Sequence, residues 1–183
     1  MKDLKCKTLS SKYLCKKPWL TVRKDKIQLA NGKINPAYYV LEYPDWINVI
    51  AETEDGKIII EKQFRQGTKE ISTEICSGVI EKYETPLQAA KRELKEETGY
   101  VSDEWRATSV LHPNSSTSNN SVHSFTCKNA RKVSEQHLDE TEDVIFELKD
   151  KKEVFEMLKD GIFNQTSGAA ALWRYFYYQN KKK

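Results

Sequence analysis

A short helix with clear ends constrains this chain more than any other feature of its sequence. Thr85 is a favourable N-cap residue, Pro86 suits the first helical position, and Gln88 can complete a capping box with Thr85. Gly99 follows the last residue of the helical repeat and suits a left-handed C-terminal stop. These local signals predict a helix over residues 86–98.

Three acidic residues share one face of this predicted helix. Glu93, Glu96 and Glu97 stand at positions i, i+3 and i+4, so their carboxylates are neighbours that repel one another. Arg92 can neutralise one of them. Divalent cations would relieve the remaining repulsion, and a set of carboxylate oxygens suits Mg²⁺ or Mn²⁺. The alternative is an acidic helix face that is only solvated.

A wider pattern surrounds the helix. It reads Gly78, five residues, Glu84, seven residues, Arg92-Glu93-Leu94, one residue, Glu96-Glu97, one residue and Gly99-Tyr100. At average residue usage, chance agreement is on the order of 10⁻⁹ per starting position. The pattern resembles the Nudix box and matches it at every defining position.

Resemblance to the Nudix family implies a Nudix-type α/β/α sandwich with a mixed sheet. It also implies hydrolysis of a nucleoside diphosphate linked to another moiety. The family's metal ligands fall on Glu93 and Glu97, with Glu96 as a third acid of the site, and Arg92 matches the arginine that orients these carboxylates. Mg²⁺ is the expected cofactor, with Mn²⁺ as the alternative.

Two segments before the box resemble the ADP-ribose pyrophosphatase branch of this family. Gln63 and Arg65 match a strand that ends in Gln-x-Arg, where the arginine meets the substrate. The stretch from Glu74 to Gly78 matches the lead-in Glu-x-x-Ala-Gly, with serine in place of alanine. In the family, the residue before this glycine gives a backbone carbonyl to the metal, so Ser77 inherits that role.

Two loops after the box carry further resemblance. Pro113 matches a proline of the branch, although it follows the box slightly sooner, and it is expected to contact substrate together with Ser116. The polar loop at 114–120 lacks the glutamate that the branch usually has there, which leaves the distal sugar open. The second loop is acidic, and the family's catalytic base falls on Glu140 and a further metal ligand on Glu142.

The acidic loop has a physical interpretation beside the resemblance. Four acids crowd into residues 139–143, just before an apolar strand. A carboxylate in such a cluster can accept a proton from water, and a general base contributes typically 10²–10⁴-fold in rate. The alternative is an acidic turn that only keeps the loop soluble.

Strand and turn signals predict the remaining organisation. Residues 1–18 resemble a polar arm, and residues 19–43 an antiparallel hairpin around Asn31-Gly32, so we expect an N-terminal region over 1–44. Strands, helix, strands and helices then follow over 45–183, which fits one Nudix hydrolase domain with a mixed sheet between helices. Three isoleucines in a row, 58–60, predict a strand buried on both faces.

Composition excludes several classes of function. The 30 basic and 27 acidic residues give a net charge of +3, which is no signature of nucleic-acid binding. No stretch approaches the ~20 apolar residues that span a bilayer. The four cysteines form no CxxC pair, which favours reduced thiols in a cytoplasmic protein.

The resemblance therefore predicts a small-molecule nucleotide substrate, with ADP-ribose hydrolysed to AMP and ribose 5-phosphate. Alternatives are another nucleotide sugar, NADH, a modified nucleoside triphosphate, or a nucleotide-sensing Nudix domain without turnover. In the family, N-terminal strands exchange across a dimer and aromatic side chains stack on adenine. A homodimer is thus expected, and Trp46 is the first candidate for stacking, with ordinary strand packing as the alternative.

Overall fold

The structure is a computed structural model that describes residues 3–181 of the chain. Its contacts divide the chain into two compact units. One unit holds the residues up to Pro44 together with His112–Ser121, and the other holds Asp45–Leu111 and the residues from Val122 onward. The polar loop expected within the second domain is therefore part of the N-terminal unit.

The N-terminal unit is built on a three-stranded antiparallel sheet. Its strands, in the order β1-β2-β3, are β1 (Lys7–Lys17), β2 (Leu20–Gln28) and β3 (Ile34–Glu42). The predicted hairpin is confirmed by the pairing of β2 with β3, and Gly32 takes a φ of +83° in the turn between them. The predicted polar arm is wrong, because residues 7–17 pair along β2. Backbone pairing stabilises this strand, which shows no apolar alternation that sequence reading could detect.

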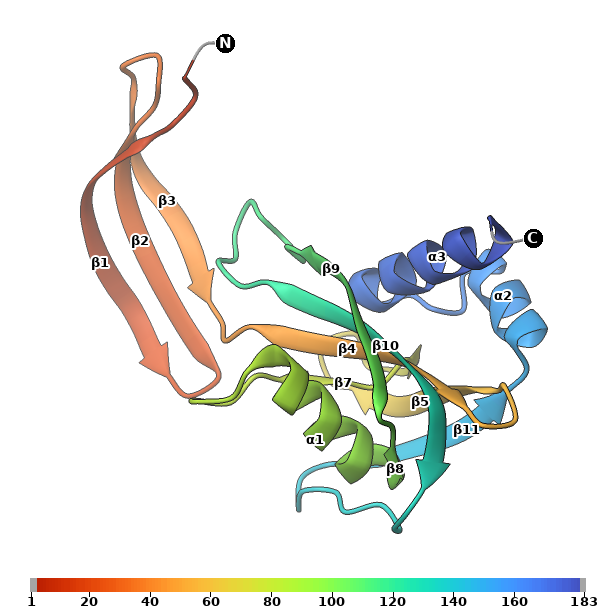
Figure 1. Ribbon diagram of the computed structural model, residues 1–183. Coiled ribbons are helices and arrows are strands. Elements are labelled where there is room, and N and C mark those ends of the chain that lie inside the picture. Colours follow the sequence, from red (N-terminus) through yellow and green to blue (C-terminus); the bar gives the residue numbers. More distant parts are fainter. Residues whose placement is uncertain (1–2, 182–183) are drawn as a thin grey trace. The chain divides into compact units, whose positions relative to one another are not determined.

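The larger unit holds a mixed sheet (Figure 1). Its central order is β11-β5-β4-β10-β8, with β6, β7 and β9 pairing at β5, β4 and β10. The pairing of β4 with β10 is parallel, and the other pairings are antiparallel. The strands are β4 (Trp46–Thr53), β5 (Ile58–Arg65), β6 (Glu70–Glu74), β7 (Ser77–Val79), β8 (Tyr100–Val101), β9 (Glu104–Leu111), β10 (Val122–Lys132) and β11 (Val144–Lys149).

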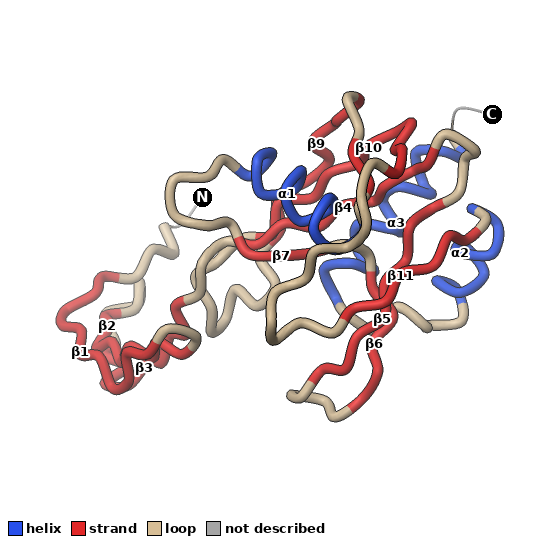
Figure 2. The backbone as a smooth tube through the Cα atoms, turned by 90° about the horizontal axis from the view of Figure 1, so that it is seen from below, coloured by secondary structure: helices blue, strands red, loops and turns tan. Residues whose placement is uncertain are grey.

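Helices cover both faces of this sheet (Figure 2). Helix α1 (Pro86–Thr98) lies on one face, and α2 (Lys151–Lys159) and α3 (Thr166–Asn180) lie on the other. Along β5, Ile59 packs in the cluster beneath α1, whereas Ile58 and Ile60 pack in the cluster beneath α2 and α3. All three are at most 1% exposed, which confirms the prediction of a strand buried on both faces. Among the described residues, no helix combines the length and apolar character that crossing a membrane requires.

Strands β4 and β5 diverge from a common end. Their register pairs Glu52 with Ile58, while the start of β4 pairs with β7 and the end of β5 pairs with β6. The chain that joins β6 to β7 crosses between them, and the Val49 amide donates to the Cys76 carbonyl at 2.8 Å. This crossing brings the β6–β7 segment to the middle of the face that α1 covers.

Candidate functional site

Helix α1 begins and ends at the predicted residues. The Thr85 amide donates to the Gln88 side chain at 2.8 Å, and the Gln88 amide donates back to the Thr85 hydroxyl, which completes the capping box. At the other end Gly99 has a φ of +75°, and its amide donates to the Lys95 carbonyl at 2.8 Å. A Cβ at Gly99 would lie 2.0 Å from the Ser134 carbonyl oxygen, so the following loop can approach closely only at a glycine.

Glu93 lies directly against the backbone of β7. A Cβ at Gly78 would lie 2.0 Å from the Glu93 Oε1 atom, so any side chain there would displace the carboxylate. The neighbouring Ser77 pairs with Asn48 of β4, which fixes the strand on which the carboxylate rests. Gly78 is therefore required at this position because the absence of a side chain leaves room for the Glu93 carboxylate of α1.

Arg92 joins three acids into one network, which we call the Arg92 cluster (Arg92, Glu84, Glu93 and Glu96). Its guanidinium donates to both carboxylate oxygens of Glu84, at 2.8 and 3.0 Å, and to Glu96 at 3.0 Å. It also lies 2.9 Å from Glu93 and donates to the Val79 carbonyl. These hydrogen bonds lower the pKa of Glu84. One arginine thus balances much of the charge that the spacing of the glutamates creates.

Glu97 has no such cation beside it. Its side chain is 3% exposed, its Oε2 atom has no hydrogen-bond partner, and within residues 3–181 it forms no ion pair. Burial is the main cause that raises the pKa of Glu97 to about 8, and burial likewise raises the pKa of Glu93 to about 7. A buried, unpaired carboxylate is costly unless a cation joins it. The donor set therefore fits a hard divalent cation, which prefers carboxylate oxygens.

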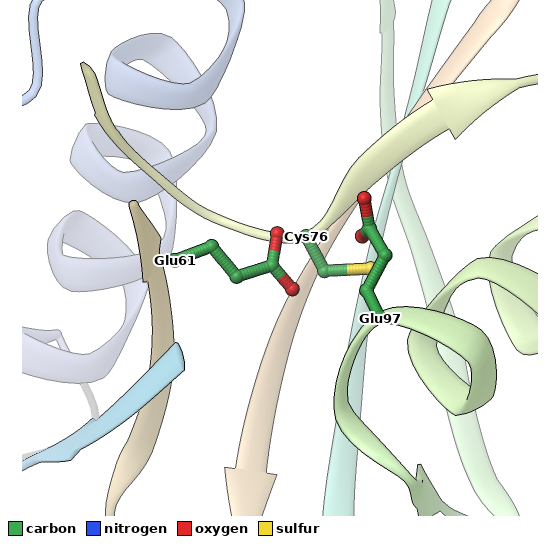
Figure 3. A group of neighbouring side chains, drawn as sticks. All are labelled: Glu61, Cys76 and Glu97. Carbon is green, nitrogen blue, oxygen red and sulfur yellow. The ribbon is translucent and has the colours of Figure 1, made fainter. Parts of the chain in front are cut away.

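Two buried residues near Glu97 were missed by the sequence analysis. Glu61 of β5 is 1% exposed, and Cys76 in the β6–β7 crossing is also 1% exposed. Each of these three residues, Glu61, Cys76 and Glu97, offers one potential ligand atom, a carboxylate oxygen or the thiol sulfur. The three atoms lie within 4.8 Å of one another (Figure 3). Burial and the charge of Glu97 hold the pKa of Glu61 well above its usual range. A sequence signal did exist, because Glu61 directly follows three isoleucines of a strand predicted to be buried.

Arg65 lies at the end of β5 and is held by Glu74. The guanidinium donates through Nε and Nη2 to the two Glu74 oxygens, at 2.8 and 2.5 Å. Gln165 of the segment before α3 donates to the same carboxylate at 3.2 Å. The arginine is therefore fixed in direction, on the strand that also carries Glu61.

The acidic loop approaches the end of α1. Gln136 donates to the Glu97 carbonyl at 2.6 Å and to the Val144 carbonyl at 3.1 Å, which ties the loop to both α1 and β11. The charge of Glu142 raises the pKa of Glu93 and Glu97, which shows that Glu142 lies near both. Glu140 is exposed. The structure thus brings Glu142 to the predicted ligands and leaves Glu140 at the surface of the same loop.

The other predicted substrate residues are divided between the two units. Trp46 begins β4 and precedes Ile47, which packs beneath α1, so strand alternation places Trp46 on the opposite face. Pro113 and Ser116 belong to the N-terminal unit. There the Tyr38 hydroxyl donates to the Ser116 carbonyl at 2.5 Å, and residues of the loop bond to the backbone of β3. No pattern in the sequence indicated that this loop pairs with β3.

Comparison with known proteins agrees with this architecture. Residues 7–41 match the nucleoside diphosphate sugar hydrolase N-terminal domain, and residues 43–161 match the NUDIX domain. An ADP-ribose pyrophosphatase of Bacillus subtilis (strain 168) is 32% identical over 143 residues, which cover 78% of this chain and 77% of that protein. A methanol dehydrogenase activator of Bacillus methanolicus is 31% identical over 109 residues, 58% of each chain.

A solved structure shares the whole fold. It is described as the crystal structure of an ADP compounds hydrolase, and it superposes with a TM-score of 0.86 over 100% of this chain and 98% of its own. Sequence identity is 20%, so this likeness bears on the fold alone. It confirms the predicted fold class, a mixed α/β sandwich preceded by a small antiparallel β-hairpin, which the structure extends to a three-stranded sheet.

Proposed function

Because the chain belongs to the Nudix family and is a Nudix pyrophosphatase, we propose that it hydrolyses the pyrophosphate bond of a nucleoside diphosphate sugar. ADP-ribose is the favoured substrate, with AMP and ribose 5-phosphate as products. The observation that carries this proposal is the buried pair Glu93 and Glu97, one of which has no cation beside it. The matched N-terminal domain and the relative named ADP-ribose pyrophosphatase support the substrate class.

A divalent cation, Mg²⁺ or Mn²⁺, would be held by the carboxylates of Glu93, Glu97 and Glu142 and by the Ser77 carbonyl. When bound, such a cation offsets phosphate charge and makes water more acidic. Arg92 keeps Glu93 and Glu96 in place through its contacts at 2.9 and 3.0 Å. Glu96 adds negative charge at the exposed edge of the same face, where it complements the bound cation.

We assign the binding of substrate and the activation of the attacking water to residues around these carboxylates. Arg65 spends Nε and Nη2 on Glu74, and its Nη1 is the donor that would reach a diphosphate or distal-sugar oxygen. Water attacks a phosphorus atom, the bridging P–O bond breaks, and Glu140 accepts the proton of the attacking water. Trp46, Pro113 and Ser116 remain proposed substrate contacts.

A substrate panel tests the reaction. The full chain is incubated with Mg²⁺ and ADP-ribose, other nucleotide sugars, NADH or modified nucleoside triphosphates, and the products are separated by chromatography. We expect the highest kcat/KM for ADP-ribose, with AMP and ribose 5-phosphate in equal amounts. A higher value for another compound would reassign the substrate, and no turnover of any diphosphate would favour a sensing domain.

The role of Glu140 has its own test. Glu140→Gln should lower kcat by roughly 10²–10⁴-fold because a general base is lost. Cation affinity should stay unchanged, as measured by isothermal titration with Mn²⁺. Glu135→Gln is the matched control, because Glu135 is an exposed acid nearby in the same segment and pairs with Lys132. An unchanged kcat in Glu140→Gln would move the base elsewhere.

The proposed homodimer is supported by the N-terminal sheet. Its strands leave several large apolar side chains more than two-fifths exposed, namely Leu9, Tyr13, Leu14, Leu20, Ile34 and Tyr39. Exposed apolar groups of this kind favour a protein interface. Light scattering of the full chain should give twice the mass of one chain, and Leu14→Lys should lower that mass.

A further inference from the structure

The three side chains of Glu61, Cys76 and Glu97, called here the inner triad, converge from different elements. Glu61 comes from β5, Cys76 from the β6–β7 crossing and Glu97 from α1. Figure 3 shows the two glutamates approaching Cys76 from either side. A carboxylate oxygen of each glutamate and the cysteine sulfur lie within 4.8 Å of one another. All three residues are at most 3% exposed.

Two carboxylate oxygens of this triad lack a partner. Among the described residues, Glu61 Oε1 and Glu97 Oε2 are buried and accept no hydrogen bond from outside the triad, and both side chains are turned into the triad. In the chain from residue 3 to 181, neither glutamate forms an ion pair. The cross-strand neighbour of Glu61 is Glu74, whose charge is already balanced by Arg65. Buried polar atoms without partners are rare, and here they surround one point.

The cysteine distinguishes this point from an ordinary magnesium site. Mg²⁺ takes oxygen ligands and gains nothing from sulfur. A thiolate beside carboxylates suits thiophilic cations, and Zn²⁺ commonly takes sulfur and carboxylate ligands together. Ligand atoms around a tetrahedral Zn²⁺ lie about 3.5 Å apart. Ligand atoms within 4.8 Å of one another would therefore need to approach by at most about 1.3 Å, which glutamate side chains can do by rotation.

We propose that the inner triad is a binding site for a thiophilic divalent cation such as Zn²⁺, held by the Cys76 thiolate and the carboxylates of Glu61 and Glu97. Binding releases the thiol proton, and any carboxyl proton, to solvent, with no change of oxidation state. Glu97 joins this site to the exposed carboxylates, because the charge of Glu142 reaches it.

The shared ligand predicts regulation, a consequence that rests on the proposed function. Glu97 belongs to both the inner triad and the proposed magnesium site. A Zn²⁺ ion in the triad takes up this carboxylate and so weakens the binding of Mg²⁺. Zinc should then inhibit hydrolysis supported by Mg²⁺, and this inhibition should weaken when Cys76 is replaced.

Cadmium is the probe for binding, because a cadmium–thiolate bond absorbs in the ultraviolet. Cys6 is exposed and Cys15 is partly buried, so Cys6→Ser and Cys15→Ser are introduced first, to remove accessible thiols. The metal-free full chain is then titrated with Cd²⁺ in the absence of substrate. We expect one charge-transfer band that saturates at one ion per chain. No such band would overturn the proposal and would indicate that Glu61 and Glu97 only share a proton.

Three further variants in this background locate the site. Cys76→Ser should remove the band, and Glu61→Gln should weaken Cd²⁺ binding at least about tenfold while keeping the band. Cys127→Ser is the matched control, because Cys127 is also buried at 1% exposure but lies outside the triad. Circular dichroism checks that each variant folds. An unchanged affinity in Glu61→Gln, or loss of the band in Cys127→Ser, would overturn the proposal even if Cys76→Ser did not fold.

Failure of the two proposals can be told apart. Binding of Cd²⁺ is read without substrate, so it stands even if no diphosphate is hydrolysed. Conversely, hydrolysis supported by Mg²⁺ without a cadmium–thiolate band would keep the proposed function and remove the inner cation site.

Discussion

Two sets of glutamates on the same face of the sheet solve the problem of buried charge in different ways. In the Arg92 cluster a guanidinium pairs with three carboxylates, those of Glu84, Glu93 and Glu96. In the inner triad Glu61 and Glu97 have no cation, and burial raises the pKa of both. Glutamates of one face are therefore paired with an arginine in one place and lack a cation within the described residues in the other.

Replacing one acid from each set gives the largest expected contrast. Glu97→Gln removes a proposed ligand with no internal cation, and should lower turnover on the order of 10³-fold because charge stabilisation by the metal is lost. Glu96→Gln removes an acid that Arg92 already pairs at 3.0 Å, and should cost much less. Steady-state kinetics with ADP-ribose and Mg²⁺ measure both. Equal losses of turnover in the two variants would contradict the distinction between the inner triad and the Arg92 cluster.

The position of Glu93 within the Arg92 cluster depends on a glycine. In Gly78→Ala the new Cβ would lie 2.0 Å from Glu93 Oε1, so the carboxylate must move. We expect kcat to fall roughly 10–100-fold, with a loss of stability of about 1–3 kcal/mol from overpacking. Gly67→Ala is the control, because nothing lies within 4 Å of its Cβ. Full activity in Gly78→Ala would show that the placement of Glu93 is not critical.

The contribution of the Arg92 hydrogen bonds to the free energy of unfolding can be measured separately. Arg92→Lys keeps one charge but loses the fork that donates to both Glu84 oxygens, and should lower the free energy of unfolding by about 2 kcal/mol. The exposed pair Arg131–Asp103 provides the control, and Arg131→Lys should change stability by less than about 0.5 kcal/mol. Urea unfolding gives both values, and similar values would mean that Arg92 acts as an ordinary surface arginine.

The raised pKa of Glu97 in the inner triad should make the stability of the protein depend on pH. The pKa of Glu97 is raised from 4.5 to about 8, so the folded chain binds this proton more tightly than the unfolded chain. Stability of the metal-free protein should therefore fall as pH rises from 4.5 to about 8, by at most about 1.4 kcal/mol per pH unit for each such carboxyl. Divalent cation should reduce the slope, and so should Glu97→Gln. A slope of the opposite sign would contradict the assignment.

Local signals in the sequence determined the part of the site that lies on α1. The capping box and Gly99 act over a few residues, so the bounds 86–98 were predictable. The spacing of Glu93 and Glu97 placed both on one helix face without any tertiary information. The strand buried on both faces was equally readable, because consecutive isoleucines need two apolar environments. The same signals could not show β1, whose stability comes from pairing with β2.

Only the tertiary structure decided what surrounds these glutamates. Glu61 reaches Glu97 because β4 and β5 diverge and the β6–β7 segment carries Cys76 between them. The loop 112–121 joins the N-terminal unit through backbone bonds to β3. Such meetings depend on the register and crossing of strands far apart in the chain, which residue patterns do not encode. The sequence by itself determined which acids share one face of α1, whereas the packing of the sheet determined which of the described acids are buried without a cation.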